Sequence, residues 1–248
     1  MYQFFLIIGV FIILFNTLLA KSYSAEDIQI SDDKGVYVLE LFTSQSCSSC
    51  PAADAFLEEL DQKQNIITLS CNVTYWNHLH WKDTLSQEAC TERQLNYSLA
   101  NHRNGNVFTP ELVINGKKSL VGSSRKRIVN YLSDENNTVT PLEISQNNNQ
   151  LRIKPIADQS LLPVNNQVVM ITYGDKHKQY VESGENRGKT ISYSNPVVEI
   201  KMISEQWNGQ STVESELPDN RENISGVVVL ITKAAVGNEI LAAGRLKL

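Results

Sequence analysis

The chain has 248 residues, of which 42% are hydrophobic and 20% are charged, and its formal net charge is −5. This composition is ordinary for a globular protein, and the length fits one large domain or two modest ones. The acidic balance argues against nucleic acid as a partner, because the densest basic patch, Ser123–Arg127, fits a solvated helix start better than a binding site.

The first residues have the pattern of a secretory leader. Tyr2–Ala20 carries no charge and is mostly Phe, Leu, Ile and Val, although no Lys or Arg precedes the run. Cleavage is expected after Ala20, Ser22 or Ser24. The run is nearly long enough to span a bilayer, so retention as an anchor is the alternative. Export predicts a periplasmic or secreted protein that has no membrane contact after cleavage.

Four cysteines, Cys47, Cys50, Cys71 and Cys90, make up the thiol content of the chain. In an oxidising compartment an even count favours disulfides, and four cysteines allow three pairings. The close spacing of Cys47 and Cys50 makes them one natural pair, which leaves Cys71 and Cys90 for a structural bond.

The first half of the chain alternates strands and helices. Val36–Phe42 is β-rich, and a helix is expected from Ser49 to Lys63, capped by Ser48 or Ser49 and with Pro51 in its first turn. Asn65–Val73 is the next strand. A β–α–β order predicts a parallel pair with a right-handed crossover.

A second helix is predicted over Leu85–Asn104, a hairpin turn at Asn115-Gly116, and a third helix over Ser123–Asp134. The order is therefore β–α–β–α–β–β–α. After Leu132 the chain becomes polar and then breaks into short β-like segments without a helical stripe, which predicts a second, all-β unit, a small sandwich.

Four blocks carry a family resemblance: "VLELFTSQSCSSCPAAD", "YWNHLHWKDT", "FTPELVINGKKSLVGS" and "GENRGKTISYSNPVVEI". The chain resembles the thioredoxin-like superfamily and, more narrowly, the bacterial domain-of-unknown-function 1223 family of exported proteins. The resemblance implies an α/β thioredoxin-like fold followed by a smaller all-β, sandwich-like C-terminal unit. The expected organisation is a leader over 1–24, a thioredoxin-like domain over 30–134 and the all-β domain over 140–248.

Three positions depart from the pattern of that family. Ser46 stands where its members usually have Gly, and Thr74 and Asn77 stand where they usually have Asp. Thr74 and Asn77 therefore remove two carboxylates near the expected site.

Cys47 and Cys50 have the spacing and the place of a redox pair. Disulfide exchange needs an accessible thiolate and a resolving thiol, and a helix N-terminus lowers the pKa of a thiol. Cys47 is expected to be the exposed attacking thiol and Cys50 the buried resolver, with Ser48 and Ser49 as donors to the thiolate. The alternative is a structural disulfide that never turns over.

A metal site is the weaker interpretation. Zinc commonly takes four ligands, and His78, His80 and His102 match no zinc spacing with the single C-x-x-C. Copper(I) could use the two thiolates alone. We expect no metal and no other cofactor.

The resemblance implies a cis peptide bond at Thr109-Pro110, facing Cys47, and a Thr109 backbone that pairs with an extended substrate. The alternative is a trans proline that opens a strand. Trp76 is expected to line the substrate groove or to pack against the sheet, as are Tyr75 and Trp81. By the same resemblance, the loop Gly184–Thr190 could cover the dithiol.

Glu40 is the third candidate for the chemistry. It lies among apolar residues of the first predicted strand, so its carboxylate is expected to be partly buried. Thioredoxins keep an acid at nearly this place to move a proton under the resolving cysteine. The alternative is an ion pair with Lys34, Lys82 or Arg187.

These residues favour an exported thiol–disulfide oxidoreductase that acts on protein or peptide thiols and disulfides. The first rival is a non-catalytic binding or scaffold module in which both disulfides are structural. A copper-handling thiol protein is the second rival.

Overall fold

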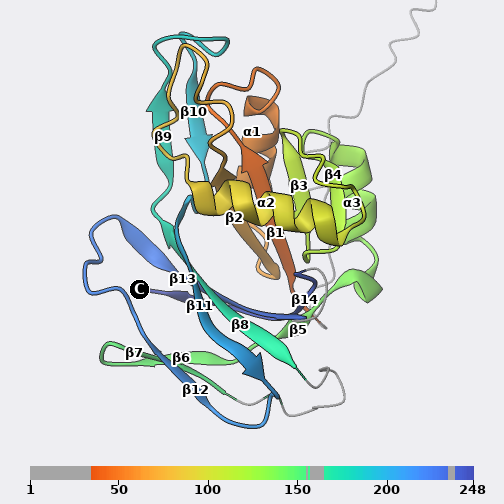
Figure 1. Cartoon of the computed structure of the whole chain (residues 1–248), viewed down its shortest axis with the longest axis vertical. Helices are drawn as coiled ribbons and strands as arrows, with labels where there is room; N and C mark the ends of the chain where they lie inside the picture. The colour runs from red at the N-terminus through yellow and green to blue at the C-terminus, as the bar shows by residue number, and fades with distance from the viewer. Residues whose placement is uncertain (1–34, 155, 157–164, 234–237) are drawn as a thin grey trace, which may run out of the picture.

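The computed structural model of the chain describes residues 35–154, 156, 165–233 and 238–248 (Figure 1). The expected leader, 1–24, and the candidate ion-pair partner Lys34 lie outside the described residues. Within the described part, no helix is long and apolar enough to cross a bilayer.

The N-terminal half is a four-stranded mixed sheet with three helices, which confirms the predicted α/β class. Its elements are β1 (Tyr37–Thr43), α1 (Pro51–Leu60), β2 (Ile66–Asn72), α2 (Glu88–Ala100), β3 (Glu111–Ile114), β4 (Lys118–Val121) and α3 (Arg125–Leu132). The strand order is β2-β1-β3-β4, and β1 and β2 are parallel as predicted. The hairpin turn at Asn115-Gly116 is also confirmed, since both residues have positive φ.

The start of α1 differs from the prediction. Its N-cap is Cys50, which has helical φ and ψ and makes no side-chain capping bond, and Pro51 opens the first turn. A cap from Ser48 or Ser49 is therefore wrong. The backbone N–H of Cys50 donates to the Cys47 carbonyl at 3.2 Å, so the turn of the C-x-x-C loop enters the helix directly. The second cysteine thus stands at the N-terminus of the helix.

The two faces of the four-stranded sheet bury different partners. Alternate residues of β1, Leu39 and Leu41, pack against α1 and α3, whereas Val38 and Phe42 pack on the opposite face. That opposite face meets α2 and a large sheet from the C-terminal half, so one core cluster draws on both halves of the chain.

The C-terminal half is built of strands, with one short 3-10 helix, η2 (Glu135–Asn137), before them. The strands are β5 (Thr140–Pro141), β6 (Ile144–Asn147), β7 (Gln150–Ile153), β8 (Asn166–Gly174), β9 (His177–Tyr180), β10 (Thr190–Tyr193), β11 (Val197–Trp207), β12 (Val213–Glu216), β13 (Ile224–Lys233) and β14 (Ile240–Lys247). They form a five-stranded sheet (β11-β8-β13-β14-β5), a three-stranded sheet (β12-β7-β6) and a hairpin (β9-β10).

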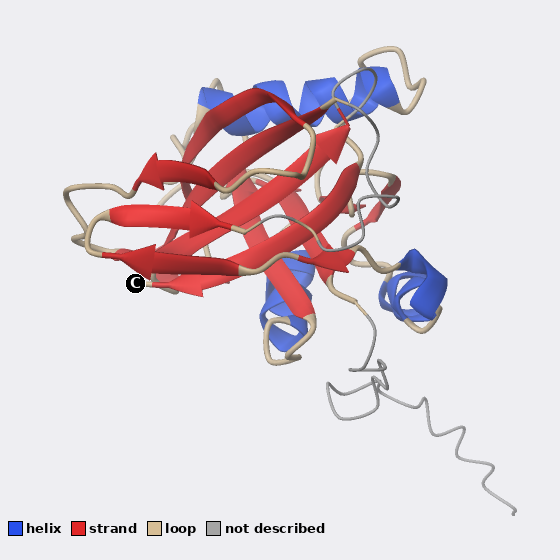
Figure 2. Ribbon diagram, turned by 90° about the horizontal axis from the view of Figure 1, so that it is seen from below, coloured by secondary structure: helices blue, strands red, loops and turns tan. Residues whose placement is uncertain are grey.

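The five-stranded sheet lies in the middle of the molecule (Figure 2). One face packs against the three-stranded sheet through residues such as Met170, Val229 and Leu151, as in a sandwich. The other face packs against the N-terminal half through Ile171, Val228 and Leu230. Its two edges are irregular: β11 has three register shifts against β8, and β5 is a two-residue strand that contains Pro141.

The hairpin β9-β10 leaves the large sheet and lies beside α1 (Figure 1). Val181, Ile191 and Tyr193 form a small buried cluster there, against Trp81 and Leu85. The hairpin thus brings a C-terminal segment to the end of α1 that carries the cysteines.

Candidate functional site

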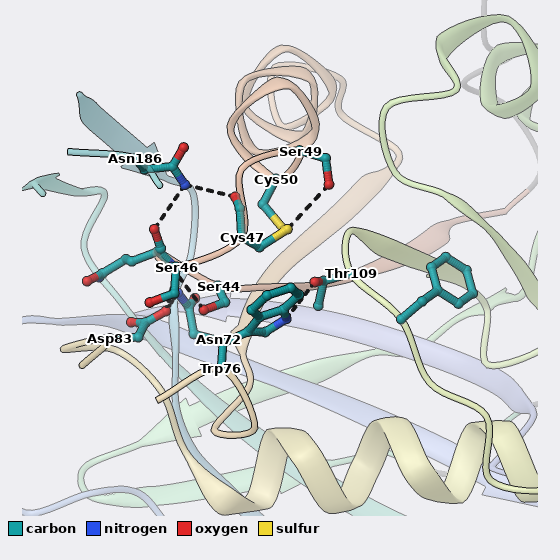
Figure 3. Close-up of a disulfide and its surroundings, with 12 residues drawn as sticks. Ser44, Ser46, Cys47, Ser49, Cys50, Asn72, Trp76, Asp83, Thr109 and Asn186 are labelled. Carbon is teal, nitrogen blue, oxygen red and sulfur yellow. Dashed lines mark hydrogen bonds between the residues drawn. A yellow bond between two sulfur atoms is a disulfide. The ribbon is translucent and has the colours of Figure 1, made fainter. Parts of the chain in front are cut away.

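The candidate site centres on the Cys47–Cys50 disulfide, whose Cα atoms are 5.4 Å apart. β1 leads into the loop that holds Cys47, and Cys50 caps α1. The Sγ of Cys47 lies 3.4 Å from the Oγ of Ser49 (Figure 3), which matches the predicted contact between this sulfur and a serine of the motif.

Both cysteines are buried, with 2% of Cys47 and 0% of Cys50 exposed. The expectation of an exposed Cys47 is therefore wrong for this oxidised state, although Ser48 and Ser49 between them are exposed. The reason is the loop before Cys47, residues 44–46, which is itself buried and bound to neighbouring segments.

The loop after β2 holds one side of the cysteine loop. Asp83 Oδ2 accepts from the backbone N–H of Gln45 at 2.8 Å, and Trp81 Nε1 donates to Gln45 Oε1 at 2.8 Å. Ser46 Oγ donates to the Trp81 carbonyl at 2.9 Å. The hydroxyl of Ser46 therefore joins the two loops. Asn77, in place of an acid, accepts from the Asp83 N–H at 3.0 Å.

Asn186 holds the other side, from the loop between β9 and β10. Its buried amide donates to the carbonyls of Gln45 at 2.9 Å and Cys47 at 2.8 Å (Figure 3). Lys189 donates to Asn186 Oδ1 at 2.9 Å. The segment that the resemblance placed near the dithiol thus contacts its backbone.

The peptide bond between Thr109 and Pro110 is cis, as predicted. The hydroxyl of Thr109 accepts from Trp76 Nε1 at 2.8 Å, and both side chains lie beside the disulfide in Figure 3. Trp76 is half-buried and also packs against the core, as does Tyr75. Substrate binding by Thr109, Pro110 and Trp76 stays a prediction.

Glu40 faces α2, on the side of the sheet opposite α1. Its carboxylate accepts from Arg93 Nε at 2.5 Å and Nη2 at 3.1 Å and also from the Tyr97 hydroxyl, with all three side chains buried. The predicted ion pair with Lys82 or Arg187 is therefore wrong, because the buried side chain of Arg93, from α2, binds Glu40 directly. A role of Glu40 in proton transfer stays a prediction.

Cys71 and Cys90 form the second disulfide, as predicted, with Cα atoms 5.4 Å apart and both residues buried. The bond ties β2 to the first turn of α2. It closes the aromatic loop between them, including the Thr74 hydroxyl that donates to Glu88 at 2.7 Å.

Sequence reasoning missed Asp54, in the first turn of α1. Burial raises the pKa of this carboxyl well above its usual value, the neighbouring Thr43 hydroxyl lowers the pKa in part, and the charge of Asp83 raises it further. The available signal was an acid at a position that the apolar stripe of α1 buries, next to Ala53 and Phe56. Nothing in the local pattern pointed to Asp83, Arg93 or Asn186 as members of the buried networks.

The histidines considered as metal ligands lie in other segments than the cysteine loop. His78 contacts the Tyr75 carbonyl at 2.8 Å, and His102 follows the end of α2 with positive φ. Across the described ranges, no group of three or more His, Cys, Asp or Glu side chains gathers as a metal site would require. Copper(I) binding by the reduced thiols stays a prediction.

The family model described as "Protein of unknown function (DUF1223)" matches residues 38–232. The chain belongs to this family. A crystal structure of protein AGR_C_4864 from Agrobacterium tumefaciens has a similar fold, with a TM-score of 0.70 and 28% identity over 87% of this chain and 96% of that one. HBP35 of Porphyromonas gingivalis shares the fold at a TM-score of 0.53 and 14% identity, over 87% and 76% of the two chains. No curated protein matches this chain.

Proposed function

We propose that the protein is an exported thiol–disulfide oxidoreductase whose redox pair is Cys47 and Cys50. The observation that carries the proposal is the position of their disulfide at the N-terminus of α1, beside Thr109 and Trp76. In this proposal, residues 30–134 are a thioredoxin-like domain and residues 140–248 are an all-β domain that supports it.

The chemistry follows from the helix terminus. The N-terminus of a helix stabilises an anion, so a reduced Cys47 would be held as a thiolate. This thiolate attacks one sulfur of a substrate disulfide, and the other substrate sulfur leaves as a thiolate. Cys50 then attacks Cys47 Sγ, which releases the second substrate thiolate and restores the bond seen here.

The proposed substrates are protein or peptide thiols and disulfides. An extended backbone could pair with Thr109, while exposed apolar side chains, Phe108 and Val121, flank the cis proline in sequence and across the hairpin. The two disulfides in the described part of the chain fit an oxidising compartment, which supports export to the periplasm or the medium.

The second candidate function is a non-catalytic binding module. The observation that favours it is the burial of both cysteines, together with the hydrogen bond that Asn186 donates to the Cys47 carbonyl. In an exchange enzyme, the segments that bury Cys47 must move aside when a substrate binds. In a module they never do.

The test is the redox activity of the mature chain. We expect reduction of insulin disulfides or oxidation of a peptide dithiol, lost in Cys47→Ser while the circular dichroism spectrum is unchanged. The matched control is the double variant Cys71→Ala/Cys90→Ala, which removes the other disulfide and should keep the activity. A reduction potential of ~−120 to −270 mV fits exchange enzymes. A potential below about −300 mV, with no exchange towards any tested thiol or disulfide, favours the module.

A further inference from the structure

Several buried polar side chains between α1, the sheet and the hairpin lack a hydrogen-bond partner. Thr43 Oγ1, Asn72 Oδ1, the Tyr193 hydroxyl and both carboxyl oxygens of Asp54 are buried, and none has a partner among the described residues. An unpaired buried polar group destabilises the folded state, so a group of them at one place needs a functional explanation.

Asp54 connects this group to the dithiol. It follows Cys50 by four residues, and its backbone N–H donates to the Cys50 carbonyl at 3.0 Å. Residues four apart lie on the same face of a helix, and Cys50 and Asp54 are 0% and 1% exposed. The carboxyl of Asp54 therefore lies on the buried side of α1 on which Cys50 also lies.

The surroundings of Asp54 favour its neutral form. The titratable groups that act on it are Asp83, from the loop after β2, and Tyr193, from β10, while Thr43 faces it from β1. Burial and the negative charge of Asp83 both raise the pKa of Asp54, and the Thr43 hydroxyl offsets only part of this. In the oxidised protein, these surroundings favour the neutral carboxyl of Asp54, the form that has a proton to donate.

We propose that Asp54 donates a proton to Cys50, and takes it back, during thiol–disulfide exchange, an inference that rests on the proposed function. A donor thiolate attacks Cys47 Sγ and forms a mixed disulfide, and the Cys47–Cys50 bond breaks with its electron pair on Cys50 Sγ. The Asp54 carboxyl then transfers its proton to this sulfur and becomes a carboxylate. In the reverse direction the carboxylate takes the proton from the Cys50 thiol, Cys50 attacks Cys47, and the donor leaves as a thiolate.

The step needs such a donor because Cys50 is fully buried. A thiolate released there without a proton or a cation would be a buried, uncompensated charge. The other buried acids are already engaged. Glu40 is paired with Arg93 on the opposite face of the sheet, and Asp83 accepts hydrogen bonds from Gln45, Asn72 and Leu85. Glu111 is paired with Arg103 and accepts from Gln94.

The experiment measures the rate at which excess dithiothreitol reduces Cys47–Cys50 in the mature full-length protein. The reduction is run at pH values from 5 to 9 and stopped by alkylation of the free thiols. Mass spectrometry then gives the reduced fraction of the protein, and each rate is divided by the concentration of dithiothreitol thiolate. We expect the corrected wild-type rate to fall as pH rises and Asp54 loses its proton. In Asp54→Asn it should be about 100-fold lower at pH 6 and independent of pH, since proton transfer contributes roughly 10²–10⁴-fold. The control is Glu58→Gln, one turn further along α1 with its carboxylate on Lys176 at the surface, which should match the wild type.

The outcomes separate the two proposals. Equal corrected rates for Asp54→Asn and the wild type would overturn the role of Asp54. If the wild type still reduces insulin in that case, the proposed oxidoreductase function is retained. A wild type that exchanges with no thiol or disulfide overturns the function itself. If Asp54→Asn does not fold, the wild-type infrared difference spectrum between reduced and oxidised protein decides. The carbonyl stretch of a protonated carboxyl should change on reduction, and an unchanged band would overturn the proposal.

Discussion

α1 and α2 cover opposite faces of the same four-stranded sheet, and they are held in different ways. α1 buries an apolar stripe that includes Phe56, Leu57 and Leu60. α2 buries Arg93, Gln94, Tyr97 and Ser98 instead, while its leucines point outward, with Leu95 40% and Leu99 55% exposed.

Three kinds of bond replace the apolar stripe under α2. Arg93 and Tyr97 bind Glu40, Gln94 donates to Glu111 at 2.7 Å, and Cys90 is bonded to Cys71. Apolar burial tolerates small shifts of a helix, whereas paired charges and a disulfide require a defined position. The comparison teaches that a helix whose leucines face outward can still be part of a core, provided that each buried polar group is paired.

The largest effect is expected from breaking the buried pair under α2. Arg93→Ala leaves the Glu40 carboxylate buried without its cation, which should lower the free energy of unfolding by about 3–5 kcal/mol in urea denaturation. The control is Arg152→Ala, which breaks a half-exposed ion pair between Arg152 Nε and Glu214 Oε1, 2.7 Å apart. This variant should lower the free energy of unfolding by no more than about 1 kcal/mol. Similar losses in the two variants would mean that the charges under α2 do not hold it.

Leucine truncations sharpen the same contrast without touching a charge. Leu57→Ala on α1 should cost about 2–5 kcal/mol, because it removes a buried side chain from a packed core. Leu99→Ala on α2 should change the stability by no more than about 0.5 kcal/mol, because the side chain is exposed. Urea denaturation at one pH measures both changes. A large loss of stability in Leu99→Ala would contradict the outward orientation of the Leu99 side chain.

The smallest effect is expected from the pH dependence of stability that Asp54, the buried acid of α1, contributes. The pKa of Asp54 is higher in the folded protein than its usual 3.8, so the folded state binds more protons above that pH. Its contribution to stability is complete below the unfolded pKa and is lost as pH rises towards the folded pKa, at up to ~1.4 kcal/mol per pH unit. As the pH rises from 4 to 7, the stability of Asp54→Asn should therefore increase relative to that of the wild type.

Urea denaturation across this range measures that trend. The contrast is Glu58→Gln, in which the trend should be weak and of opposite sign, because the Lys176 ammonium lowers the pKa of Glu58 at the surface. A constant difference between Asp54→Asn and the wild type would mean that Asp54 titrates alike in the folded and unfolded chains.

Local patterns predicted most of the N-terminal elements. β1, α1 and β2 follow from runs of apolar residues, and the Asn115-Gly116 turn follows from the two residues that adopt positive φ most readily. The cysteine pairing follows from spacing, since only one pair is close in sequence. These features depend on neighbours along the chain, and a sequence records neighbours directly.

The contacts that shape the site depend on residues far apart. Asn186 binds the carbonyl of Cys47 across 139 positions, and Arg93 meets Glu40 across 53. A local pattern contains no information about such partners, so the predicted exposure of Cys47 and the partners assigned to Glu40 were wrong. The central place of the five-stranded sheet was missed for the same reason, because both of its faces are apolar and either could have met solvent or core.

The irregular edges of that five-stranded sheet bear on self-association. β13 is a nearly continuous run of Val, Leu and Ile, the type of segment that pairs readily with copies of itself. In the folded chain it lies between β8 and β14, away from the edges. At one edge the register shifts and exposed Glu199, Lys201 and Glu205 of β11 oppose the approach of another strand, and at the other edge the short β5 offers Pro141, which has no N–H to donate. The sheet is thus protected against growth into a larger β-assembly at the two places where a further strand could add.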